Sequence, residues 1–119
     1  KKHSEIEKFE DLGKKLSDLI ENIFKVDVII TDREKVIVST KGDELINKLL
    51  DEELIYLIDN REEFVGRKDI LGNIGNVTIV PIIASIDSLG LIILISNDDL
   101  DLKNIARFMA KILSEKLNI

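Results

Sequence analysis

The sequence predicts an α+β fold, an α/β/α sandwich in which helices cover both faces of one antiparallel β-sheet. Three observations predict it. Residues 4–24 and 102–117, near the two ends of the chain, carry apolar residues at helical spacing. The segments between them are rich in β-branched residues and are separated by polar turns. Residues 77–80 and 91–95 do not alternate apolar and polar positions, as strands with one face in water would.

The first helix is predicted for residues 4–24, where apolar side chains recur at alternating steps of three and four residues. This spacing is typical of a narrow coiled-coil seam. The seam consists of Phe9, Leu12, Leu16, Leu19 and Ile23.

A β-hairpin follows, with strands at residues 26–31 and 36–39 and a polar turn at residues 32–35. Apolar residues at helical spacing then predict two short helices within residues 43–60. We place the break between these helices at the acidic residues 51–53.

The last part of the sheet is predicted to contain three strands. Residues 64–70 form a short edge strand, and residues 71–76 form a turn rich in glycine and asparagine. Residues 77–96 form two strands that break at residues 86–88. Pro81 has no amide donor, so we expect it at a bulge or at an unpaired position.

The closing helix is predicted for residues 102–117, whose apolar stripe includes Ile105, Met109 and Ile112. Three aspartates within residues 98–101 suit the positive end of its dipole. We interpret them as caps rather than calcium ligands, because no glycine-bearing loop of the EF-hand kind surrounds them.

The helices are expected to form the two outer layers. The terminal helices cover one face of the sheet, and the short helices of residues 43–60 cover the other. We therefore predict a single domain over residues 1–119, with any ligand cavity between the sheet and the middle helices.

Composition excludes several classes of function. The chain has no cysteine and one histidine, His3, so we expect no thiolate nucleophile, no histidine metal cluster and no Ser-His-Asp arrangement. We predict no catalytic residues, no metal and no cofactor, and we interpret the protein as non-enzymatic. The net charge of −6 disfavours contact with the phosphate backbone of DNA.

Two further expectations concern the setting of the chain. No apolar run reaches the roughly 18 to 20 residues of a membrane span, and no signal-peptide core follows the charged start. We therefore expect no membrane contact and a cytoplasmic location. The chain begins at Lys1 rather than methionine, which leaves room for a DNA-binding module upstream.

The order of elements resembles that of a GAF domain, a small sensing module that shares its layout with PAS domains. Five further segments have a recognisable pattern: Ser4-Glu5-Ile6, Val28-Ile29-Ile30-Thr31-Asp32-Arg33, Leu45-Ile46-Asn47-Lys48, Val80-Pro81-Ile82-Ile83-Ala84 and Leu89-Gly90-Leu91-Ile92-Ile93. Through these segments, and over essentially the whole chain, the sequence resembles the C-terminal domains of the stage V sporulation protein T family, transcriptional regulators of endospore-forming bacteria. This resemblance implies oligomerisation through the terminal helices, an unidentified small-molecule effector and an upstream DNA-binding domain of the AbrB type.

The sequence departs from three other groups of GAF domains. It lacks the cysteines of the methionine sulfoxide reductases and the cysteine that anchors bilins. Asn47-Lys48 is not followed by the rest of the cyclic-nucleotide phosphodiesterase pattern. We therefore expect none of these activities or ligands.

The residues predicted to bind a ligand are polar and lie at strand ends or in loops, where a small-molecule site would open. An anionic ligand would favour Arg33 or Arg67 through charge-assisted hydrogen bonds. A solvated turn explains Asp32, Arg33 and Lys41 equally well. The full set is Thr31, Asp32, Arg33, Ser39, Lys41, Arg67, Asn73 and Thr78.

The terminal helices are predicted to form a bundle with a second subunit, giving a homodimer or a higher homo-oligomer. The alternative is a monomer in which both helices only cover the sheet. The leading hypothesis for function is a regulatory domain that oligomerises and binds an effector; the alternatives are a purely structural dimerisation module and an enzyme. The predicted interface residues are Phe9, Leu12, Leu16, Leu19, Ile23, Ile105, Met109 and Ile112.

Overall fold

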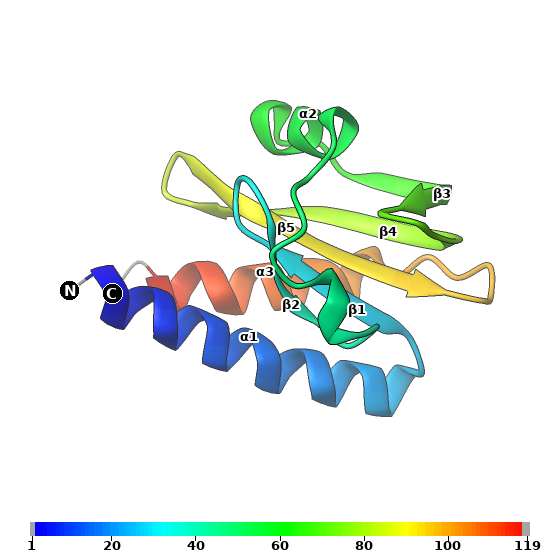
Figure 1. The fold of residues 1–119 in the computed structure, drawn as a ribbon, viewed down its shortest axis with the longest axis horizontal. Coiled ribbons are helices and arrows are strands. Elements are labelled where there is room, and N and C mark those ends of the chain that lie inside the picture. The colour runs from blue at the N-terminus through cyan, green and yellow to red at the C-terminus, as the bar shows by residue number, and fades with distance from the viewer. Residues whose placement is uncertain (1, 118–119) are drawn as a thin grey trace.

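The computed structural model describes residues 2–117 of the chain, with side chains described for residues 9–116. Figure 1 shows three layers: α1 and α3 lie on one face of the β-sheet, and α2 lies on the other. The predicted α/β/α sandwich is therefore confirmed. The helices α1 and α3 run in opposite directions, so the start of α1 and the end of α3 lie at the same end of the molecule (Figure 1).

The sheet has five strands in the order β2-β1-β5-β4-β3, and every neighbouring pair is antiparallel. The strand predicted at residues 64–70 does lie at an edge, as β3. In chain order the elements are α1 (Lys2–Phe24), β1 (Asp27–Thr31), β2 (Val36–Ser39), the 3-10 helix η1 (Asp43–Leu45), α2 (Glu52–Asn60), β3 (Phe64–Ile70), β4 (Asn73–Ala84), β5 (Asp87–Ser96) and α3 (Lys103–Leu117).

The segment between β2 and β3 differs from the prediction of two short helices. It contains one 3-10 turn, η1, and one α-helix, α2, which begins at Glu52. The acidic residues 51–53 therefore start a helix instead of separating two. Asp51 is the N-cap: its Oδ1 accepts a hydrogen bond of 3.0 Å from the backbone N–H of Leu54.

Both hairpins of the sheet's second half turn more tightly than predicted. Only Leu71 and Gly72 separate β3 from β4, and only Ser85 and Ile86 separate β4 from β5. Leu71 and Gly72 both have positive φ, 52° and 91°, as the two central residues of a type I′ hairpin turn require. The predicted turn at residues 71–76 is thus two residues long, because its asparagine and glycine positions after Gly72 already pair in β4.

The central strand β5 is buried on both faces, which explains why its sequence does not alternate. Ile92 and Leu94 belong to the core beneath α1 and α3, whereas Leu91 and Ile93 belong to the core beneath α2. All four side chains have no exposed surface. Alternate residues of β5 therefore pack into the two cores on opposite faces of the sheet. Helices on both faces are needed to shield the strand from water.

Pro81 lies in a part of β4 that has a strand on one side only. It pairs with Leu91 of β5, but β3 ends its pairing at Ile79, two residues earlier. A register shift between Ile82 and Ile83 follows directly. A proline fits in a strand where its missing N–H faces away from a paired neighbour, as expected for this position.

Gly90 is required by the close approach of β5 to the end of β1. A Cβ at this position would lie 1.8 Å from the carbonyl oxygen of Thr31, far below any tolerated contact. We expect Gly90→Ala to lower the free energy of unfolding by more than about 3 kcal/mol, beyond the range of most single substitutions. Urea denaturation followed by circular dichroism measures this change.

Gly72→Ala is the matched control. Gly72 has φ 91°, but no atom lies within 4 Å of the Cβ it would gain. We expect only the cost of a left-handed residue, about 1 to 2 kcal/mol. Equal losses in the two variants would show that the steric argument for Gly90 is wrong.

Candidate functional site

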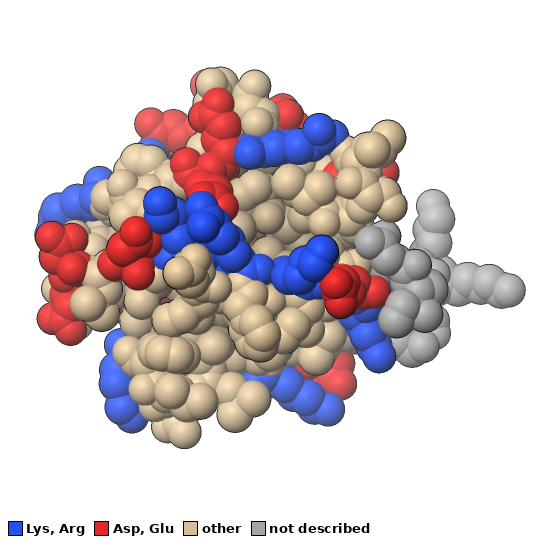
Figure 2. Space-filling model, turned by 180° about the vertical axis from the view of Figure 1, so that it is seen from behind, with Lys and Arg blue, Asp and Glu red and all other residues tan. Residues whose placement is uncertain are grey.

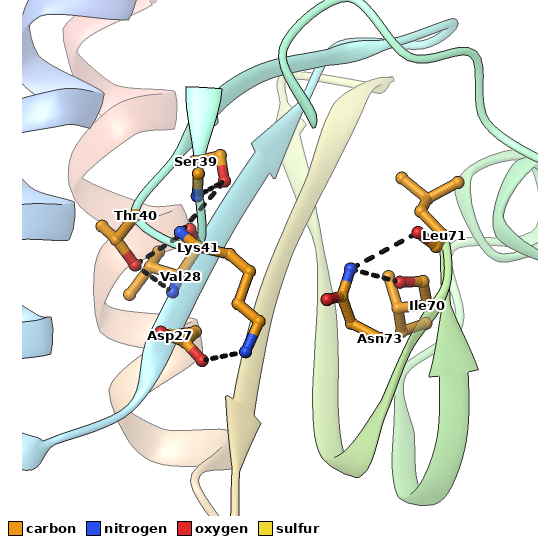
Figure 3. A network of polar contacts seen from close by, with 9 residues as sticks. Asp27, Val28, Ser39, Thr40, Lys41, Ile70, Leu71 and Asn73 are labelled. Carbon is orange, nitrogen blue, oxygen red and sulfur yellow. Dashed lines mark hydrogen bonds and ion pairs between the residues drawn. The ribbon is translucent and has the colours of Figure 1, made fainter. Parts of the chain in front are cut away.

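The residues predicted to bind a ligand do not meet in one place. Most of them hold turns and strand ends. Figure 3 shows Ser39 and Lys41 beside β1 and β2, while Asn73 lies apart from them at the turn that joins β3 and β4.

Thr31 and Thr78 are buried and act within the fold. The Oγ1 of Thr31 accepts a hydrogen bond of 3.1 Å from the N–H of Leu91 and donates one of 2.7 Å to the carbonyl of Asp32. The Oγ1 of Thr78 accepts from the N–H of Leu102 at 3.4 Å, directly before α3. Neither hydroxyl is directed at a ligand cavity.

Asp32 closes the turn between β1 and β2. Its Oδ1 accepts hydrogen bonds of 2.8 Å from the N–H groups of Glu34 and Lys35, an Asx turn. The carboxylate is therefore engaged by backbone.

Arg33 ties the same turn to two other elements. Its Nη1 donates to the carbonyl of Ser88 at 2.8 Å, and its Nη2 pairs with Asp59 of α2 at 3.1 Å. The predicted ligand-binding arginine thus fixes the end of α2 over the sheet.

Ser39, Lys41 and Asn73 also serve local structure (Figure 3). The Oγ of Ser39 accepts from the N–H of Lys41 at 3.1 Å, and the Nζ of Lys41 pairs with Asp27 at 3.4 Å. The Nδ2 of Asn73 donates to the carbonyls of residues 70 and 71 at 3.3 Å. Arg67, the remaining member of the set, is exposed on β3.

Directly beneath α2, where we expected a cavity, side chains fill the space, and a groove of about 380 Å³ lies at the edge of this layer between α2 and β3. Leu54, Leu57 and Ile58 of α2 pack there against Ile79 and Ile93 of the central strands. The described residues of this layer form a continuous hydrophobic core.

A groove of about 470 Å³ lies instead on the opposite face of the sheet, between α3 and the end of β4. We call it the α3 groove. Figure 2 views the molecule from behind and shows a hollow with an uncharged floor, bordered by Lys and Arg side chains. The α3 groove is lined by Arg61, Glu63, Val80, Pro81, Ile83, Arg107, Ala110, Lys111 and Ser114.

A bidentate ion pair crosses the α3 groove. The Nε and Nη2 of Arg107 donate to the two carboxylate oxygens of Glu63 at 2.7 and 2.6 Å. The hydrogen bond from Arg107 lowers the pKa of Glu63 below its ordinary value, and the same bond raises the pKa of Arg107. The sequence did not predict this pair, because Arg107 lies 44 residues from Glu63 along the chain.

Arg61 forms another border of the groove. It is the C-cap of α2 in the left-handed conformation, with φ 53°, and its Nη2 donates to the carbonyl of Ile86 at the tip of the β4–β5 hairpin. The sequence offered no pattern that singled out Arg61, since a left-handed cap at an arginine is uncommon.

The apolar seam predicted on α1 is only partly buried. The face that packs on the sheet contains Phe9, Gly13, Ser17 and Ile20. The rest of the seam lies beside that face: Leu12 and Leu16 are half-buried, and Leu19 and Ile23 are 56% and 64% exposed. The predicted seam therefore runs along the border of the buried face, and its last two residues, Leu19 and Ile23, lie largely in water.

The closing helix α3 shows a similar division. Ile105 and Ile112 are half-buried and Phe108 is 58% exposed, whereas Met109 has no exposed surface. Met109 and Phe9 belong to the core of the single chain, so the prediction that they lie in a subunit interface is corrected. Phe108 was not predicted, although the steps from Ile105 through Phe108 to Ile112 are three and four residues.

These two stripes define a surface that we call the apolar valley. In Figure 2 the region where α1 and α3 lie is mostly free of charged side chains, below the charged border of the α3 groove. The apolar valley consists of Leu12, Leu16, Leu19, Ile23, Ile105, Phe108 and Ile112.

The described part of the chain shows neither a metal site nor a membrane-spanning helix. Within residues 2–117 there is no group of three His, Cys, Asp or Glu residues that could hold a metal ion. None of the described helices is long and apolar enough to cross a membrane.

The chain is similar to a known protein family and to solved structures. A family model described as stage V sporulation protein T C-terminal, transcription factor, matches residues 8–118. No curated protein matches the chain.

Solved structures share the fold at low sequence identity. Residues 122 to 287 of a methyl-accepting chemotaxis protein align with a TM-score of 0.71 and 10% identity, covering 92% of this chain and 88% of that one. The GAF domain of an Acinetobacter phosphoenolpyruvate-protein phosphotransferase aligns with a TM-score of 0.67 and 12% identity, covering 92% and 80%. The predicted GAF-like fold is confirmed, and at these identities the likeness concerns the fold alone.

Thr31 tests whether a predicted ligand residue is structural. We expect Thr31→Val to lower the free energy of unfolding by about 1 to 3 kcal/mol, because the buried N–H of Leu91 loses its acceptor. Arg67→Gln, an exposed change in the same predicted set, should alter it by less than about 0.5 kcal/mol. Thermal and urea denaturation measure both, and an unchanged stability for Thr31→Val would contradict the structural role.

The Glu63–Arg107 pair predicts a pH dependence of stability. Because the folded-state pKa of Glu63 is lowered, its contribution is present above the unfolded pKa and is lost as the pH falls through the folded pKa. We expect the native chain to exceed Glu63→Gln in stability at pH about 6, and this advantage to shrink progressively as the pH falls below about 4. Urea denaturation across this range measures it, with Glu62→Gln as the control; a pH-independent difference would contradict the pair's role.

Proposed function

Since the chain belongs to the family of stage V sporulation protein T C-terminal domains, a transcription-factor family, we propose that it is the regulatory and dimerisation module of a transcription factor. The observation that carries this proposal is the apolar valley. It places four half-buried and three exposed large apolar side chains on the terminal helices, where the single chain leaves them in contact with water.

The helix flanks that face away from the valley differ in character. On α1 the opposite flank carries Glu10, Asp11 and Lys14 beside the edge strand β2. On α3 the opposite flank carries Arg107 and Lys111 beside the α3 groove. The apolar residues therefore face the furrow between the two helices, on the side of the helices away from the sheet.

A second copy of the chain is the occupant that this surface favours. A two-fold axis through the valley would bring α1 and α3 of each subunit together as a four-helix bundle, the arrangement that steps of three and four residues support. Each large apolar side chain removed from water would contribute about 1.5 kcal/mol or more. The net charge of −6 argues against DNA as the partner of this domain itself.

Such a bundle would give the module its regulatory role. The upstream DNA-binding domain that the family resemblance implies would join the start of α1, so the bundle would set the distance between two such domains. A regulator of this kind acts in the cytoplasm, where bacterial DNA lies. The packed core beneath α2 favours a second candidate, a dimerisation module that binds no ligand between α2 and the sheet.

Leu19→Asp tests the dimer. Leu19 is 56% exposed, so an aspartate there should leave the fold intact, but it would place a charge in the apolar valley of both subunits. We expect the native chain to sediment as a dimer at micromolar concentration and Leu19→Asp to sediment as a monomer with an unchanged circular dichroism spectrum.

Ile74→Asp provides the matched control. Ile74 is 65% exposed on β4, outside the valley, so this variant should remain dimeric. A monomeric native chain, or a dimer that survives Leu19→Asp, would remove the proposal.

A further inference from the structure

The α3 groove concentrates positive charge on an acidic protein. Arg61, Arg107 and Lys111 line it together with one carboxylate, Glu63, while the whole chain carries a net charge of −6. We propose that the α3 groove binds a small organic anion, a carboxylate or phosphate attached to a compact apolar group. Local positive charge in a concave site attracts such a ligand even when the protein as a whole is acidic.

Arg107 is held in place for this role. Its two hydrogen bonds to Glu63 fix the plane of the guanidinium across the groove and use Nε and one N–H of Nη2. A guanidinium has five N–H donors, so three remain beyond this pair, including both on Nη1. An arginine oriented by one carboxylate can thus present its other donors to a second anion without losing side-chain entropy on binding.

The two other cations border the same space from different elements. Arg61, at the end of α2, lines the groove and donates from its Nη2 to the carbonyl of Ile86, which leaves its other N–H donors for a ligand. Lys111 of α3 pairs with Glu115 at 3.6 Å, and both side chains are exposed. Because an exposed pair of this kind is worth little, Lys111 can turn to a ligand at small cost.

The floor of the groove is apolar and would contact the apolar part of the ligand. Val80 and Pro81 are buried and Ile83 is partly exposed, and all three follow Ile79, where β3 stops covering the edge of β4. Ala110 of α3 is also buried and completes the floor. A volume of about 470 Å³ lies within the range of small-molecule sites, which combine an apolar surface with a few polar groups.

The groove and the proposed dimer interface share the helix α3. Arg107 and Lys111 lie on one flank of α3, and Ile105, Phe108 and Ile112 of the apolar valley lie on the other. An anion that bridges α3 to Arg61 would favour one position of the helix, and thereby one geometry of the dimer. This effect rests on the proposed function, whereas binding of the anion does not.

Titration of the ¹⁵N-labelled chain with benzoate, benzamide and inorganic phosphate, followed by amide NMR shifts, tests the site. Benzoate and benzamide have the same shape and differ in charge. We expect benzoate to shift amides of residues 80–83 and 107–114, with benzamide at least about tenfold weaker, as the loss of charged hydrogen bonds requires. Saturable shifts of the same amides by phosphate would support the phosphate members of the proposed ligand class.

Four variants make the assignment specific. Arg61→Gln and Lys111→Gln should each weaken benzoate about tenfold. Glu63→Gln should strengthen it, because this change removes the negative charge that repels the anion while the amide oxygen can still accept a hydrogen bond from Arg107. A misfolded variant could not produce such a gain. Lys48→Gln, at an exposed position in the loop before α2, removes the same charge and should have no effect.

The remaining outcomes overturn the inference. These are equal shifts from benzoate and benzamide, no saturable shift from benzoate or phosphate, or equal weakening by Lys48→Gln and Lys111→Gln. The same titration of Leu19→Asp separates this inference from the proposed function. If the chain is a monomer but binds benzoate, the anion site is supported and the dimer is not. If the chain is a dimer but binds neither anion, the dimer is supported and the anion site is not.

Discussion

Burial of β5 on both faces is the constraint on which the rest of the structure depends. A strand whose side chains are apolar in both directions is stable only between two layers, so α1 and α3 must stay on one face and α2 on the other. This requirement places α3 against the end of β4 and forms the α3 groove. It also uses one face of each terminal helix for the sheet, which leaves the neighbouring stripe of apolar residues in the furrow between them.

The layered fold could be predicted because its signals are local. Unbroken apolar character in residues 91–95 indicated two-sided burial, and steps of three and four residues indicated helices at both ends. The same steps could not separate core from surface. Met109 and Phe108 are adjacent in sequence, yet one is enclosed and the other is exposed, because neighbouring side chains of a helix point about 100° apart and periodicity does not specify which of them faces the sheet.

The predicted ligand residues show a different limit. Polar side chains occur at strand ends and in turns for two reasons: they can bind ligands, or they can hydrogen-bond to the backbone of the turn. Asp32 and Thr31 hydrogen-bond to the backbone. A ligand-binding residue would have the same type and position in the sequence, so the sequence does not distinguish the two roles. The charged groove was not predicted, because Glu63, directly before β3, and Arg107 of α3 are 44 residues apart in the sequence and meet only in the folded chain. Long-range ion pairs of this kind leave no spacing pattern in one sequence.

Pro81 has a consequence for how copies of this chain meet. Beyond Ile79 the edge of β4 is not covered by β3, and an open row of backbone N–H and C=O groups is a template on which strands of other molecules polymerise. A residue without an N–H, followed at once by a bulge, interrupts that row. If copies of this chain associate through the terminal helices as proposed, the interrupted edge would disfavour a competing route of association, by strand addition to β4.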